Sequence, residues 1–140
     1  MSLDQETTIS THTVLVLEDE RPLLHAITQK LEQSGFTVLA ARTVEEAFKR
    51  LETVSHVDAF WVDHYLLGKE SGLDFVMKIK DDHSQWKDVP VFVVSNTASD
   101  EKVSAYMKLG IDKYYIKTDH RLDQIIMEIR SRIENQKGAV

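Results

Sequence analysis

The chain contains no cysteine and no long hydrophobic run, and these two absences exclude several kinds of protein. Without cysteine there are no disulfides, thiolate zinc sites or cysteine nucleophiles, so any chemistry must use oxygen and nitrogen groups. No apolar run approaches the roughly 20 residues that span a bilayer, and the polar start has no apolar signal-peptide segment. We therefore expect a soluble, cytoplasmic protein that does not contact a membrane.

Basic residues are also few relative to acidic ones. The chain has 17 Lys and Arg against 23 Asp and Glu, a formal net charge of -6, which argues against direct nucleic-acid binding. With 140 residues, 42% of them apolar, and only 2 Pro and 5 Gly, it has the size and composition of one compact domain. We expect a polar leader over 1–12, one domain over 13–134 and a tail over 135–140.

Short apolar runs alternate with amphipathic stretches along the whole domain. The apolar runs are rich in β-branched residues, as in strands that helices cover on both faces. The amphipathic stretches have the 3.6-residue spacing of helices. This alternation predicts an α/β fold with a five-stranded parallel sheet and helices on both faces. The expected strands are 14–17, 37–41, 59–62, 91–94 and 114–116, and the expected helices are 21–34, 44–51, 73–80, 101–109 and 122–133.

Polar residues follow four of the five expected strands directly. Glu18 and Asp19 come after the first strand and Asp63 after the third, whereas Ser95 and Lys117 follow the fourth and fifth. In open parallel sheets, ligands bind beyond the carboxyl ends of the strands. These five side chains are therefore the candidate site.

The residue types at these strand ends favour phosphate chemistry with a metal ion. Carboxylates that share a cleft repel one another unless a cation neutralises them, and hard oxygen ligands favour Mg²⁺, with Mn²⁺ as a substitute. Glu18 and Asp19 would hold the ion, and the backbone carbonyl of Tyr65 could supply another oxygen. Asp63 stands where a carboxylate nucleophile should be, and Ser95 with Lys117 would bind the transferred oxygens.

Each of these residues also has an ordinary structural reading. Acidic residues after a strand are often helix caps or turn formers, and a single Ser or Lys is more often a surface group. Tyr114 can be a core residue that only packs against its neighbours. His64 follows Asp63 directly, and we expect it at the surface because neighbouring side chains point apart in extended backbone.

The order of these motifs resembles the response-regulator receiver family, over about Thr13 to Ile133. An acidic pair after the first strand, one Asp after the third, Ser or Thr after the fourth and Lys after the fifth form the pattern. The stretches that carry it are VLVLEDE at 14–20, DAFWVD at 58–63, ESGLDF at 70–75, VPVFVVSN at 89–96 and GIDKYYIK at 110–117.

The resemblance implies a flavodoxin-like, doubly wound (βα)5 fold with strand order 2-1-3-4-5. It also implies the roles of individual residues, which are Asp63 as phosphoacceptor, Glu18 and Asp19 as the metal-binding acidic pair, Ser95 as the switch hydroxyl, Lys117 as the essential lysine and Tyr114 as the aromatic switch.

The resemblance further implies partners rather than a substrate. A sensor histidine kinase or a histidine phosphotransfer protein would donate the phosphoryl group, and an output protein or domain would read it. The reading face would combine the helix at 101–109, the strand at 114–116 and the helix at 122–133, which is also where a homodimer would form. Such a domain is not an enzyme beyond phosphorylating itself from a phosphodonor and losing that phosphate again.

Three positions depart from the family pattern and keep other functions open. Leu67 and Thr118 stand where prolines are common, and Asn96 stands where a small residue is usual. One alternative is a degenerate receiver that binds proteins without phosphorylation. A phosphohydrolase of the haloacid-dehalogenase kind lacks its Asp-x-Asp pair here, and a flavodoxin would need a glycine-rich phosphate loop after the first strand.

Overall fold

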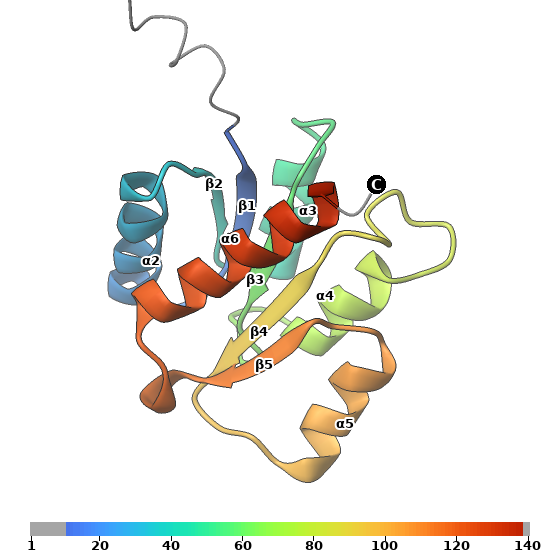
Figure 1. Ribbon diagram of the computed structural model, residues 1–140. Coiled ribbons are helices and arrows are strands. Elements are labelled where there is room, and N and C mark those ends of the chain that lie inside the picture. Colours follow the sequence, from blue (N-terminus) through green and yellow to red (C-terminus); the bar gives the residue numbers. More distant parts are fainter. Residues whose placement is uncertain (1–10, 139–140) are drawn as a thin grey trace, which may run out of the picture.

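The computed structural model describes residues 11–138, with side chains described as far as residue 135. Five parallel strands form one sheet in the order β2-β1-β3-β4-β5, and helices cover both of its faces (Figure 1). This confirms the predicted fold class. The elements are β1 (Thr13–Leu17), α2 (Arg21–Gln33), β2 (Thr37–Ala41), α3 (Val44–Leu51), β3 (Ala59–Val62), α4 (Gly72–Ile79), β4 (Val91–Ser95), α5 (Asp100–Lys108), β5 (Lys113–Ile116), the 3-10 turn η1 (Lys117–Asp119) and α6 (Leu122–Gly138).

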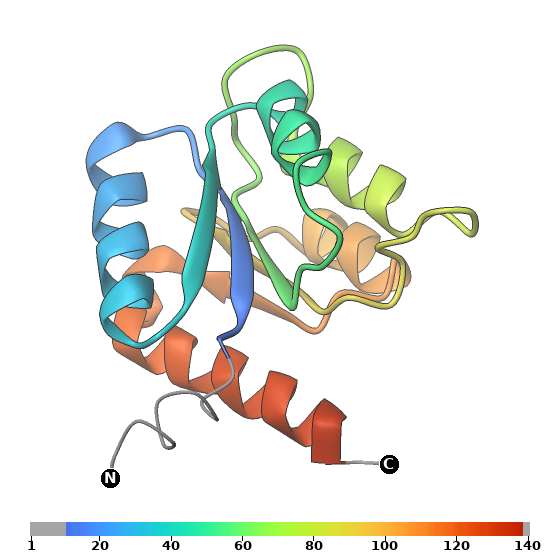
Figure 2. The same cartoon turned by 90° about the horizontal axis from the view of Figure 1, so that it is seen from above.

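Two apolar cores lie on opposite faces of the sheet, because successive side chains of a strand point to opposite sides. Leu15 and Leu17 of β1 pack toward α3, α4 and α5, whereas Val14 and Val16 pack toward α2 and α6. Figure 2 shows this division, with α2 in blue and α6 in red on one side of the sheet. All four side chains are fully buried, as expected for an interior strand of a parallel sheet.

The first strand starts one residue before its expected start, and the last helix ends beyond its expected end. The last helix, α6, continues past Glu134 to Gly138, into the expected tail. Most of the expected leader lies outside the described residues, but His12 is buried, and its backbone carbonyl accepts a hydrogen bond of 2.8 Å from the Thr37 N–H. None of the helices within residues 11–138 has the length and apolar character that crossing a bilayer requires.

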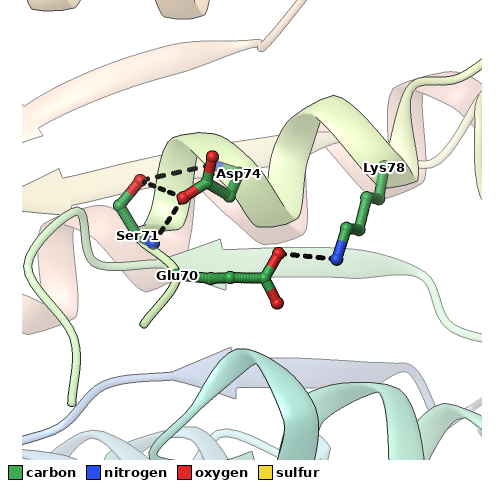
Figure 3. A network of polar contacts seen from close by, with 4 residues as sticks. All are labelled: Glu70, Ser71, Asp74 and Lys78. Carbon is green, nitrogen blue, oxygen red and sulfur yellow. Dashed lines mark hydrogen bonds and ion pairs between the residues drawn. The ribbon is translucent and has the colours of Figure 1, made fainter. Parts of the chain in front are cut away.

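Side-chain caps fix the start of α3, before β3, and the start of α4, after it. At α3, the Thr43 hydroxyl accepts from the Glu46 N–H at 3.0 Å, as the Thr43-x-x-Glu46 spacing indicates. At α4, Ser71 and Asp74 form a reciprocal capping box, and Lys78 pairs with Glu70 at 2.6 Å (Figure 3). The capping box therefore fixes the position of Ser71, where the loop that begins at His64 ends.

Gly72, the first residue of α4, lies in the tightest packing along this loop. A Cβ atom at this position would lie 2.2 Å from the backbone carbonyl oxygen of Asp63 and 2.9 Å from the Tyr106 hydroxyl. The Gly72 N–H also donates a hydrogen bond of 2.9 Å to the carbonyl of His64. Only a residue without a side chain lets α4 start this close to the end of β3.

We expect Gly72→Ala to lower the free energy of unfolding by about 1–3 kcal/mol, because the added methyl group forces backbone atoms apart. Urea denaturation monitored by circular dichroism measures this difference. Ser104→Ala, at an exposed position of α5, is the matched control and should change stability by less than about 0.5 kcal/mol. Equal stability of Gly72→Ala and the parent chain would contradict the close packing at α4.

Candidate functional site

The predicted site residues meet at the carboxyl edge of the sheet because neighbouring parallel strands end at the same level. The Asp63 N–H donates to the carbonyl of Leu17 at 2.9 Å, and the Glu18 N–H donates to that of Ala41 at 3.0 Å. These bonds extend the strand pairing by one residue beyond β1 and β3. Glu18 and Asp63 are therefore placed side by side by the sheet itself, without a specific loop conformation.

Three carboxylates form a compact cluster at this edge. One ligand oxygen from each of Glu18, Asp19 and Asp63 can be chosen so that all three lie within 4.8 Å of one another. Glu18 is fully buried and Asp63 is 3% exposed, whereas Asp19 is half-buried. The Asp19 backbone is held by the Arg42 side chain, whose Nε donates to the Asp19 carbonyl at 2.9 Å.

Lys117 places its ammonium group between the two buried carboxylates. Its Nζ lies 3.0 Å from Glu18 Oε1 and 3.4 Å from Asp63 Oδ2. Only 14% of the Lys117 side chain is exposed. An ion pair this well shielded from solvent is screened far less than a surface pair, so it links β5 to both β1 and β3.

The charges in the cluster strongly affect one another. Burial and the neighbouring Asp63 charge raise the pKa of Glu18 to about 7, against the opposing effect of Lys117. Burial also raises the pKa of Asp63, although Lys117 opposes this shift too. For Lys117, burial disfavours the charged form, but the hydrogen bond to Glu18 and the charge of Asp63 outweigh it and raise its pKa. The lysine thus stays charged while the carboxylates hold protons unusually tightly.

The other predicted residues lie around this cluster. Ser95 ends β4, is fully buried, and its hydroxyl has no hydrogen-bond partner among the described residues. Tyr114 of β5 is half-buried, and its hydroxyl donates to the Thr97 carbonyl at 2.6 Å. Tyr65 lies two residues after Asp63, with its ring exposed and its hydroxyl accepting from Lys102 Nζ at 2.8 Å.

Comparison with known proteins identifies the family. The family model of the response regulator receiver domain matches residues 14–130 of the chain. The chain belongs to the response regulator receiver family.

Individual relatives of this receiver domain differ in length. This chain is 26% identical over 105 residues to the chemotaxis protein CheY1 of Helicobacter pylori. The match covers 74% of this chain and 83% of CheY1. The chain is 33% identical over 124 residues to a cyclic di-GMP phosphodiesterase of Thermotoga maritima, covering 89% of this chain but only 32% of that protein. A CheY-like receiver domain protein from Methanospirillum hungatei shares the fold with a TM-score of 0.82 at 21% identity, covering 94% of this chain and all of that one.

The acidic cluster of the receiver domain fits a divalent cation. Its donors are all carboxylate oxygens, and Asp63 Oδ1 has no hydrogen-bond partner among the described residues. Raised pKa values mean that the ionised carboxylates lack sufficient counter-charge from Lys117 alone. A hard cation such as Mg²⁺ supplies that charge and prefers these ligands.

The structure also shows contacts of this site that the sequence analysis missed. The prediction that His64 lies at the surface is wrong, since it is half-buried and its Nδ1 lies 2.7 Å from the Tyr106 hydroxyl. The alternation argument fails because β3 ends at Val62, so His64 lies in a bend and not in extended backbone. Arg42 was not counted among the candidate residues because the strand that it follows does not end in a carboxylate. The 3.6-residue spacing of the expected helix at 101–109 puts Tyr106 on its inner face together with Val103, and this spacing is the signal in the sequence for its burial.

We expect the free energy of unfolding, measured without divalent cations, to fall as the pH rises from about 4.5 to about 7. A carboxyl group with a raised folded pKa binds its proton more tightly in the folded state, so its contribution is complete at low pH and is lost as it ionises. Urea denaturation across this pH range gives the slope. Glu18→Gln should flatten it and so should added Mg²⁺, whereas an unchanged slope in Glu18→Gln would contradict the assigned cause.

Proposed function

We propose that this receiver domain accepts a phosphoryl group on Asp63 in the presence of Mg²⁺ and changes its partner affinity as a result. The observation that carries the proposal is the position of Lys117 Nζ between Asp63 and Glu18 at the carboxyl edge of the sheet. This arrangement brings a nucleophile, Asp63, and a fixed positive charge, Lys117, next to carboxylates that could bind a metal ion, in a site shielded from solvent. Family membership supports the same reading.

The residues would divide the chemistry as follows. An oxygen of the Asp63 carboxylate forms a bond to phosphorus while the bond from phosphorus to the donor's leaving group breaks, and an aspartyl phosphate results. Glu18, Asp19 and Asp63, with the backbone carbonyl of Tyr65, would hold Mg²⁺, which when bound neutralises charge on the phosphoryl oxygens. Lys117 would turn from Asp63 toward the new phosphoryl oxygens, to which it remains attracted because it stays charged.

Ser95 and Tyr114 would carry the change to the surface. The buried Ser95 hydroxyl, without a partner in the described structure, can donate to a phosphoryl oxygen and so satisfy its own hydrogen-bonding capacity. Tyr114 would then move inward and leave the Thr97 carbonyl. The face formed by α5, β5 and α6 would change shape and bind an output protein or domain, or a second copy of the chain.

The phosphoryl donor would be a sensor histidine kinase or a histidine phosphotransfer protein, and the domain would have no turnover beyond gaining and losing its own phosphate. Direct nucleic-acid binding is not part of the proposal, in keeping with the net charge of -6. Because histidine kinases draw phosphoryl groups from ATP, which cells keep in the cytoplasm, the proposal places the domain there.

We expect the chain to gain the mass of one phosphoryl group when incubated with acetyl phosphate and Mg²⁺, because a small donor can reach Asp63 without a kinase. Intact-protein mass spectrometry measures the adduct. Asp63→Asn and removal of Mg²⁺ by EDTA should each abolish it, whereas Asp123→Asn, which changes an exposed aspartate on α6, should not. If the parent chain gained no mass, or if Asp63→Asn gained as much, the proposal would fail and a phosphorylation-independent binding role would be favoured.

A further inference from the structure

Two consecutive residues after Asp63 are both bonded to α5. The Nδ1 of His64 lies 2.7 Å from the Tyr106 hydroxyl, and the Tyr65 hydroxyl accepts from Lys102 Nζ at 2.8 Å. Lys102 and Tyr106 are four residues apart, so they lie on the same face of the helix. That face of α5 is therefore held to the loop that begins at the phosphoacceptor.

These two contacts differ greatly in their surroundings. Tyr106 is fully buried, whereas Tyr65 is 54% exposed and its bond to Lys102 lies at the surface. Exposed polar contacts contribute little, because water replaces either partner easily. Breaking the buried bond instead leaves a hydroxyl without a partner in an apolar region, which is costly. The contact between His64 and Tyr106 is thus the stronger of the two.

The protonation states of the buried pair favour one hydrogen-bond direction. Burial and the nearby Tyr114 hydroxyl raise the pKa of Tyr106, so its hydroxyl keeps its proton. Burial and the charge of Lys102 lower the pKa of His64, so the ring is neutral near pH 7. A neutral imidazole has one acceptor nitrogen, and Tyr106 can donate to it at Nδ1.

The Tyr106 hydroxyl also lies beside Gly72, which packs against the backbone of the phosphoacceptor. A Cβ atom added to Gly72 would meet both the Asp63 carbonyl oxygen, at 2.2 Å, and the Tyr106 hydroxyl, at 2.9 Å. The end of β3, the start of α4 and this hydroxyl are therefore packed against one another. Because there is no free space at this point, a shift of the Asp63 backbone must displace the atoms packed against it.

On its other side, Tyr106 contacts the predicted switch residue. Its ring packs edge to face against Tyr114, with ring centroids 5.8 Å apart. A continuous chain of contacts thus runs from Asp63 through His64 and Tyr106 to Tyr114. Ser95, at the end of β4, makes no hydrogen bond through its hydroxyl to this series of residues within the described part of the chain.

We propose that Tyr106 is a positioning residue that couples Asp63 to α5 and Tyr114 through its hydrogen bond to His64. The inference rests on the proposed phosphorylation of Asp63. A phosphoryl group on Asp63 moves the adjacent His64, and the buried hydrogen bond either carries Tyr106 with it or breaks. In both cases α5 and the packing surface of Tyr114 change together.

The test compares variants that remove single groups. Tyr106→Phe deletes only the hydroxyl, and His64→Leu deletes only its partner, whereas His64→Asn keeps an acceptor near the position of Nδ1. Tyr115→Phe is the matched control, because it removes a tyrosine hydroxyl bonded to Glu128 on the opposite face of the sheet. Thermal unfolding checks that each variant is folded.

The readout is the change in backbone amide chemical shifts when Mg²⁺ and beryllofluoride, a phosphoryl analogue, are added to the full chain. In Tyr106→Phe and His64→Leu, we expect the changes along α5 and at Tyr114 to shrink by about half or more, while those at Asp19 and Glu20 persist. His64→Asn should recover much of the response, and Tyr115→Phe should retain it. A general loss of rigidity would instead reduce all of these changes together.

Two results would overturn the inference while leaving the proposed function intact. One is a full α5 response in both Tyr106→Phe and His64→Leu, and the other is an equal loss in Tyr115→Phe. In either case the parent chain would still gain the phosphoryl mass from acetyl phosphate. If the parent chain gained no mass and showed no shift changes, the proposed function would fail and the inference would fail with it.

Discussion

The ion pairs of Lys117 with Glu18 and Asp63 are the interactions on which the rest of this site depends. These two carboxylates are almost completely buried from solvent, so they repel each other and desolvation destabilises their charged forms. The ammonium group 3.0 Å from one and 3.4 Å from the other offsets part of that cost. The offset is incomplete, as the raised pKa values of both carboxylates indicate. The site is thus electrostatically prepared for more positive charge or for a change in its charges.

The parallel sheet holds these like charges together. Backbone hydrogen bonds from Glu18 and Asp63 to neighbouring strands hold both residues in place against their mutual repulsion. Each of these bonds continues a ladder that the apolar cores on both faces already stabilise. The strand pairing therefore keeps Glu18 and Asp63 together, and it does so through the fold as a whole.

The strands and helices were almost fully predictable, because buried strands and amphipathic helices follow simple periodic patterns, whereas the strand order came from the resemblance to the receiver family. Val14 to Leu17 is a continuous apolar run, and it forms the fully buried part of β1. The end of α6 was less predictable, since Glu134 to Gly138 lacks the apolar stripe that identified the earlier part of the helix. Within the site, the strand-end rule brought Glu18, Asp19, Asp63, Ser95 and Lys117 to one edge, where the structure also has them.

The sequence by itself determined which chemical groups stand at the carboxyl edge, because the length of each apolar run sets where a strand ends. Only the tertiary structure decided the contacts between His64, Gly72 and Tyr106, which bring together residues as much as 42 positions apart. Such contacts depend on the angle and depth at which α4 and α5 pack on the sheet. No local pattern encodes that geometry, since it results from the combined volumes of many buried side chains.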